Sequence, residues 1–164
     1  MITKLTKKQI EQLYEYRDEG IKIARDTTPI NHSKLEDDVR SLYFECGLNS
    51  NLNFKYYPFF EEFFKDSSID SSIYSSIYSS IHSSIDSSIH SSIRSSIWWG
   101  QYNIDSLKYY EYYSNVIGFK AKNQKLLNLL ISISKNSHIL FFFKDLVVAI
   151  ERPVRIEMEG NLLH

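Results

Sequence analysis

The segment from Ser67 to Trp98 reads SSID SSIY SSIY SSIH SSID SSIH SSIR SSIW, eight unbroken copies of the tetrapeptide Ser-Ser-Ile-x. An α-helix turns about 100° per residue, so isoleucines four residues apart drift by about 40° around the helix axis with each copy. Eight copies would therefore leave no constant apolar face to bury. Serine competes for backbone hydrogen bonds and β-branched isoleucine loses rotamer freedom, so the composition also disfavours a helix.

An extended backbone suits this period better, because four is a multiple of two and every isoleucine then points to the same side. One straight strand of this length would reach about 105 Å, far beyond an ordinary strand, so the chain must bend at regular intervals. We therefore expect a small β-solenoid with isoleucine and one serine of each copy turned inward. A long central helix in a mainly α fold and a disordered serine-rich linker are the alternatives.

The predicted fold class is α+β, with the tetrapeptide-repeat β-solenoid at its centre and small helical and α/β caps on both sides. Residues 1–66 form the N-terminal helical cap, 67–98 the repeat, and 99–164 the C-terminal helices plus a β-hairpin. At this length the three parts are expected to make one cooperative domain.

The N-terminal flank carries two helix patterns. Thr6 and Gln9 have the spacing of a capping box and start a helix that runs to about Ala24. Ser33 and Glu36 have the same spacing and start a second helix, which precedes a short aromatic strand at 52–57.

The C-terminal flank alternates between helix and strand patterns. Helices are predicted at 105–116, with Asp105 as the N-cap, and at 123–134, followed by buried strands at 139–143 and 146–150. Glu151-Arg152-Pro153 is typical of a turn, so 154–158 is expected to return as the second strand of a hairpin.

Composition excludes several classes of protein. The formal net charge is −1 with acids and bases interleaved, which does not favour nucleic-acid binding. The single cysteine excludes an internal disulfide framework. No apolar signal segment or membrane-spanning run occurs, so we expect a cytoplasmic protein without membrane contact.

Four features together resemble an uncharacterised bacterial family of unknown function. These are the helical N-terminal region, the run of Ser-aliphatic tetrapeptides, Trp99-Gly100-Gln101 closing the run, and Glu151-Arg152-Pro153 followed by a Gly-x-Leu-His motif. Here the last motif departs from the family pattern, because one extra residue separates Gly160 from Leu163-His164. The resemblance implies no activity, cofactor or substrate.

No catalytic motif appears in the sequence, and no cofactor is indicated. The chain has no His-Glu-x-x-His pattern, glycine-rich phosphate loop, nucleophile elbow or paired cysteines. The sixteen repeat serines are equivalent, whereas catalysis singles out one serine with a base. His82, Asp86 and His90 would form an exposed row rather than a closed metal site, so neither a catalytic nor a metal site is predicted.

The variable positions of the repeat are the main candidate binding site. Tyrosine, histidine, arginine and tryptophan are the residue types enriched at interface hot spots, and repeat proteins bind partners along extended rows. We therefore expect a non-enzymatic repeat protein that binds a protein partner or associates with itself. The candidate binding residues are Tyr74, Tyr78, His82, Asp86, His90, Arg94 and Trp98.

The alternative is an enzyme or small-ligand-binding protein with a site at the two flanking motifs. Trp99, Gln101, Glu151 and Arg152 would form this site, which requires a deep pocket with converging polar groups. An exposed Glu-Arg pair at a turn is the simpler explanation of Glu151 and Arg152.

Overall fold

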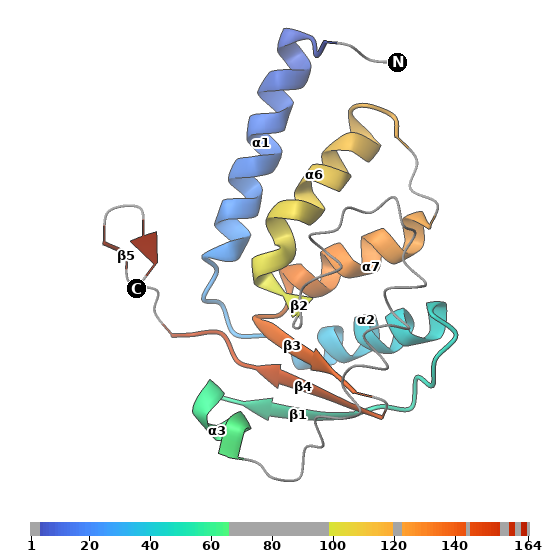
Figure 1. Ribbon diagram of the computed structural model, residues 1–164, viewed down its shortest axis with the longest axis vertical. Helices are drawn as coiled ribbons and strands as arrows, with labels where there is room; N and C mark the ends of the chain where they lie inside the picture. Colours follow the sequence, from blue (N-terminus) through green and yellow to red (C-terminus); the bar gives the residue numbers. More distant parts are fainter. Residues whose placement is uncertain are drawn as a thin grey trace.

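The computed structural model describes residues 4–65, 99–119, 123–143, 145–154, 158–159 and 162–163. The repeat, and with it every candidate residue from Tyr74 to Trp98, lies outside the described residues. The described chain folds as helices packed on a small mixed β-sheet (Figure 1).

The two N-terminal helices form where their sequence patterns predict. Helix α1 (Lys7–Ala24) starts with the expected capping box, in which the Thr6 hydroxyl accepts a hydrogen bond from the Gln9 N–H at 3.2 Å and the Gln9 side-chain oxygen accepts one from the Thr6 N–H at 2.9 Å. Helix α2 (His32–Glu45) starts one residue before Ser33, because the Asn31 side chain caps the Lys34 N–H at 3.1 Å.

One four-stranded sheet joins segments from both sides of the repeat. Strand β1 (Asn53–Tyr57) runs parallel to β4 (Leu146–Ile150), which pairs antiparallel with β3 (Ile139–Phe142). Strand β2 (Trp99–Gly100) pairs antiparallel with β3, so the strand order is β1-β4-β3-β2. The outer strands of the sheet therefore belong to the segments that precede and follow the repeat.

The helices bury one face of this sheet. A short 3₁₀ turn, η1 (Gln101–Asn103), leads into α6 (Ile104–Asn115), and α7 (Gln124–Lys135) follows. Helices α2 and α7 pack together and share a core with the side chains of Leu140, Phe142, Val147 and Ala149. Helix α1 lies against α6, away from the strands (Figure 1).

The opposite face of the sheet has its own apolar cluster. Ile139, Phe141, Phe143, Val148 and Ile150 are buried there. The six-residue helix α3 (Phe60–Lys65) contributes Phe63, whose ring stacks on Phe141 at a centroid distance of 4.6 Å. Helix α3, the last described element before the repeat, is thus packed onto the sheet.

The predicted fold organised around a β-solenoid is wrong. The α+β class holds, but the described flanks do not form two separate caps, because β1 and β4 come from opposite sides of the repeat and share one open sheet. The alternative of a long central helix concerns the repeat and lies outside the described residues. The tetrapeptide period carries information about its own segment only, so it could not reveal pairing between its flanks.

The predicted hairpin after Ile150 is also wrong. Both edges of β4 are already paired, one with β1 and the other with β3, so no returning strand can join it. Val154 is 96% exposed, and β5 (Met158–Glu159) pairs instead with β6 (Leu162–Leu163).

Within the described residues, no helix combines the length and apolar character needed to cross a membrane.

Candidate functional site

The fold brings Gln101 and Arg152 of the alternative site together and separates Glu151 from them. The Gln101 side chain reaches the backbone of Asp26, and Arg152 binds the carboxylate of the same residue. Trp99 contributes its backbone to β2, directly before the turn that positions Gln101. We call Asp26, Gln101, His138 and Arg152 the polar junction.

Gln101 closes the C-terminal end of α1. Its Nε2 donates to the carbonyl oxygens of Ile23 at 2.7 Å and Asp26 at 2.9 Å. Because this amide nitrogen is committed to carbonyls, the Oε1 atom can only accept, and it lies 3.0 Å from Nδ1 of His138. Neutral His138 therefore carries its proton on Nδ1.

Arg152 closes the C-terminal end of α7 and fixes the loop between α1 and α2. Its side chain is 3% exposed, and it donates to Asp26 Oδ2 at 2.7 Å, the Thr28 carbonyl at 3.0 Å and the Lys135 carbonyl at 2.7 Å. Desolvation raises the pKa of Asp26, but hydrogen bonds from Thr28 and the charge of Arg152 outweigh it and hold this pKa below its usual value.

The three buried residues of the polar junction, Gln101, His138 and Arg152, fill the space between the elements they join. Gln101 and Arg152 are buried, and their hydrogen bonds go to backbone carbonyls, the Asp26 carboxylate and the His138 ring. An enzyme or small-ligand site at these residues required a pocket in which polar groups are available to a ligand. The geometry instead gives these side chains a structural role in tying together α1, η1, α7 and the end of β4.

The junction makes stability depend on pH. Burial, followed by the charge of Arg152, lowers the pKa of His138 to about 4. Between the unfolded value of about 6.5 and this folded value, the unfolded chain binds a proton that the folded chain does not, so stability falls as the pH falls. Urea unfolding is expected to give a free energy lower by about 2 kcal/mol at about pH 5 than at about pH 7.

Two variants separate His138 from other titrating groups. In His138→Gln, the pH dependence between these two values should largely disappear, whereas His32→Gln should retain it because the buried His138 is still present. Equal slopes in the wild type and His138→Gln would show that His138 is not the responsible group. Asp26 contributes in the same direction but only as the pH falls below about 4, because its folded pKa is also lowered.

Glu151 belongs to a separate surface pair. Its Oε1 lies 2.6 Å from Nε2 of His32, whose ring stacks on Tyr56 at a centroid distance of 3.8 Å. The Tyr56 hydroxyl donates to Glu36 at 3.2 Å. These contacts join the start of α2 to the ends of the parallel strands β1 and β4, but they bring no nucleophile to the histidine.

A buried lysine lies between α1 and α6. The Lys108 side chain is 2% exposed, passes over Gly20, and donates to Glu19 at 2.7 Å and to Glu111, with its ammonium 4.7 Å from the Tyr16 ring centroid. Burial lowers the pKa of Lys108, but the hydrogen bonds to Glu111 and Glu19 outweigh it and raise this pKa above its ordinary value. Lys108 is therefore a charged structural group and not a nucleophilic amine.

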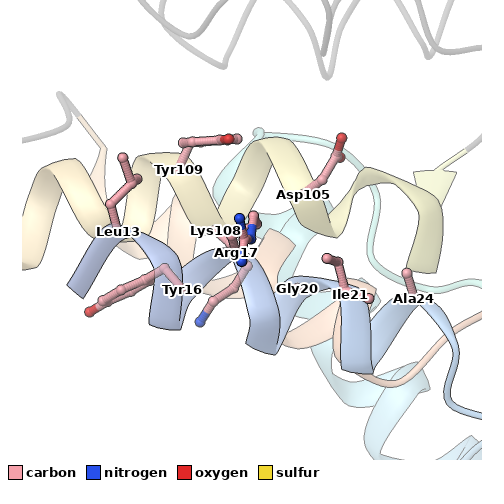
Figure 2. A pocket seen from close by; sticks show the side chains of 9 residues that line it. All are labelled: Leu13, Tyr16, Arg17, Gly20, Ile21, Ala24, Asp105, Lys108 and Tyr109. Carbon is pink, nitrogen blue, oxygen red and sulfur yellow. The ribbon is translucent and has the colours of Figure 1, made fainter. Parts of the chain in front are cut away.

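This lysine lines a groove of about 200 Å³ between the two helices. Figure 2 shows the side chains that line the groove. Gly20 lines the groove without a side chain, which leaves room for Lys108. A Cβ atom at this position would lie 3.3 Å from the Lys108 side chain. The remaining lining comes from both helices and consists of Leu13, Tyr16, Arg17, Ile21, Ala24, Asp105 and Tyr109. The groove is small and mostly apolar, and its buried ammonium is already paired.

Sequence reasoning missed Asp26, His138 and Lys108. Asp26 had a local signal, since Asp-Thr-Thr-Pro after a helix is typical of an Asx turn, and the Thr28 N–H does donate to Asp26 Oδ1 at 2.9 Å. Lys108 had a partial signal, because Glu111 follows it at i+3 on the same helix, but its second partner Glu19 and the partner of His138 come from distant elements.

Comparison with known proteins assigns no relatives. No family model matches the chain, and no curated protein or solved structure matches it either. The resemblance to an uncharacterised bacterial family stays a prediction.

The described residues contain no group of three or more histidine, cysteine, aspartate or glutamate side chains that could hold a metal ion.

Proposed function

We propose that the chain is a non-enzymatic protein-interaction module, in which the α+β fold holds the Ser-Ser-Ile-x repeat and the variable repeat side chains bind a protein partner. The supporting observation is the place of the repeat in the chain. It follows α3, which packs beside the outer strand β1, and it precedes β2, the outer strand at the other edge of the same sheet.

The described core supports this proposal because it needs residues from both flanks. The polar junction joins the end of α1 to Gln101, which stands three residues after the repeat. An insertion attached at both ends to one packed core can vary in its outward residues without changing that core. The filled polar junction weighs against the alternative enzyme or small-ligand site at the flanking motifs.

Capture by the purified, immobilised chain tests the proposal. Replacing Tyr74, Tyr78, His90 and Arg94 together with serine should leave the thermal unfolding temperature unchanged and abolish capture of the partner, which mass spectrometry identifies. A matched control replaces the exposed Tyr14, Tyr109 and Tyr113 with serine and should retain capture.

Self-association is measured separately by sedimentation velocity of the purified chain alone. A wild-type dimer that the repeat variant converts to monomer would identify a second copy as the partner. Retained capture and an unchanged oligomeric state in the repeat variant would rule out the variable positions as the binding site.

A further inference from the structure

An open hollow of about 770 Å³ lies where the end of α1, the loop after it and the end of α7 meet. Three cationic side chains line it: Lys22, Arg25 and Lys135. Neither Lys22 nor Arg25 makes an ion pair within the part of the chain that the structure describes. Their charges are therefore available to a ligand.

The two anionic residues of the hollow are already neutralised. Asp26 binds the buried Arg152 at 2.7 Å, and Glu19 binds the buried Lys108 at 2.7 Å and Lys135 at 3.4 Å. The Lys108 hydrogen bond is the leading reason that the pKa of Glu19 lies below its usual value, so Glu19 stays an ion that is committed to its partners. The hollow keeps an excess of positive charge.

The helix ends would weaken anion binding if their carbonyls were exposed, because the C-terminal end of a helix carries partial negative charge. Here the polar junction occupies one carbonyl at each helix end, that of Ile23 in α1 and that of Lys135 in α7. Gln101 donates to the Ile23 and Asp26 carbonyls, and Arg152 donates to those of Thr28 and Lys135. The buried donors thus leave the surface cations to determine the charge of the hollow.

The lining also limits the class of ligand. Thr27 supplies a hydroxyl group, Ile23 is the one large apolar residue, and no aromatic side chain is among the lining residues. A nucleobase would find no stacking surface there. Ammonium, guanidinium and hydroxyl donors around an open space suit a compact group with several anionic oxygens.

We propose that this hollow binds a compact phosphate-bearing anion, such as a diphosphate or the phosphate ester of a small polyol. Arg25 and Lys22 bind the phosphate oxygens, Lys135 adds a third cation from the end of α7, and the Thr27 hydroxyl completes the donor set. This site does not depend on the repeat or on a protein partner.

Isothermal titration calorimetry with inorganic pyrophosphate at low ionic strength tests the proposal on the full chain. Lys22→Gln combined with Arg25→Gln should weaken binding by about tenfold or more, because each removes a charge-assisted contact. The charge-matched control, Lys7→Gln with Lys8→Gln at the other end of α1, should leave the affinity unchanged. All four side chains are exposed, so none of the variants should impair folding.

A second arm distinguishes a free ligand from a lipid headgroup. Flotation with vesicles of phosphatidylcholine containing a phosphoinositide should show no binding if the ligand is a free anion. Vesicle binding that the Lys22/Arg25 variant loses and the control retains would assign the same phosphate chemistry to a headgroup. Absence of binding to both probes, or equal weakening in the variant and the control, would overturn the site.

Discussion

Gly100→Ala is expected to lower the free energy of unfolding by about 3 kcal/mol or more, because the new side chain has no space. A Cβ atom at Gly100 would lie 2.1 Å from the carbonyl oxygen of His138, which is a backbone atom and cannot rotate away. Strands β2 and β3 would have to separate, and the Gln101 N–H would lose its 3.0 Å hydrogen bond to the same carbonyl.

A second glycine provides the matched control. Gly47 has a φ of +69°, which disfavours alanine, but a Cβ atom there would meet nothing within 4 Å. Gly47→Ala should therefore cost only about 1 kcal/mol of backbone strain. Urea unfolding of both variants measures the difference. If Gly100→Ala costs no more than Gly47→Ala, the close approach of Gly100 to His138 is not a feature of the folded protein.

Gly100 lies next to the polar junction, which connects segments from both sides of the repeat. Gln101 lies just after the repeat, whereas the carbonyls and carboxylate around Asp26 lie well before it. The junction therefore joins the segment that follows the repeat to the N-terminal part of the chain. Gly100→Ala should therefore destabilise the polar junction, whereas substitutions at the variable positions of the repeat test the proposed binding surface.

Local structure was predictable from the sequence. The capping box of Thr6 and Gln9, the apolar spacing of α2 and α7, and the β-branched and aromatic runs of β3 and β4 mark elements that the structure confirms. Cap positions were less predictable, because Asn31 and Asn103 replace the expected Ser33 and Asp105. Each error moves the N-cap by only two residues.

Long-range pairing was not predictable. Asn53 pairs with Leu146, and nothing in either strand pattern specifies a partner so distant in the chain. The same limit applies to the site, because Arg152 and Asp26 are separated by 126 positions. The sequence singled out Gln101 and Arg152 as polar residues in short motifs, but only the fold shows that their hydrogen-bond partners are carbonyls and a carboxylate rather than a ligand.

Arg152→Ala is expected to lower the free energy of unfolding by about 2–4 kcal/mol, because it removes a buried guanidinium that binds two backbone carbonyls and the partly exposed Asp26 carboxylate. The variant leaves the Asp26 carboxylate without its cation and the carbonyls of Thr28 and Lys135 without their donor. Arg152→Lys should retain part of this stability, since one ammonium cannot reach all three acceptors with the geometry of a guanidinium.

Arg17→Ala is the matched control, because Arg17 is 50% exposed and pairs with its neighbour Asp18 on the surface. This control should change stability by less than about 1 kcal/mol. Urea unfolding compares the variants, and NMR titration adds a local readout: without the nearby charge of Arg152, the pKa of His138 should rise, while burial keeps it below its ordinary value. Similar losses in Arg152→Ala and Arg17→Ala, with an unmoved His138 titration, would mean that Arg152 does not hold the junction together.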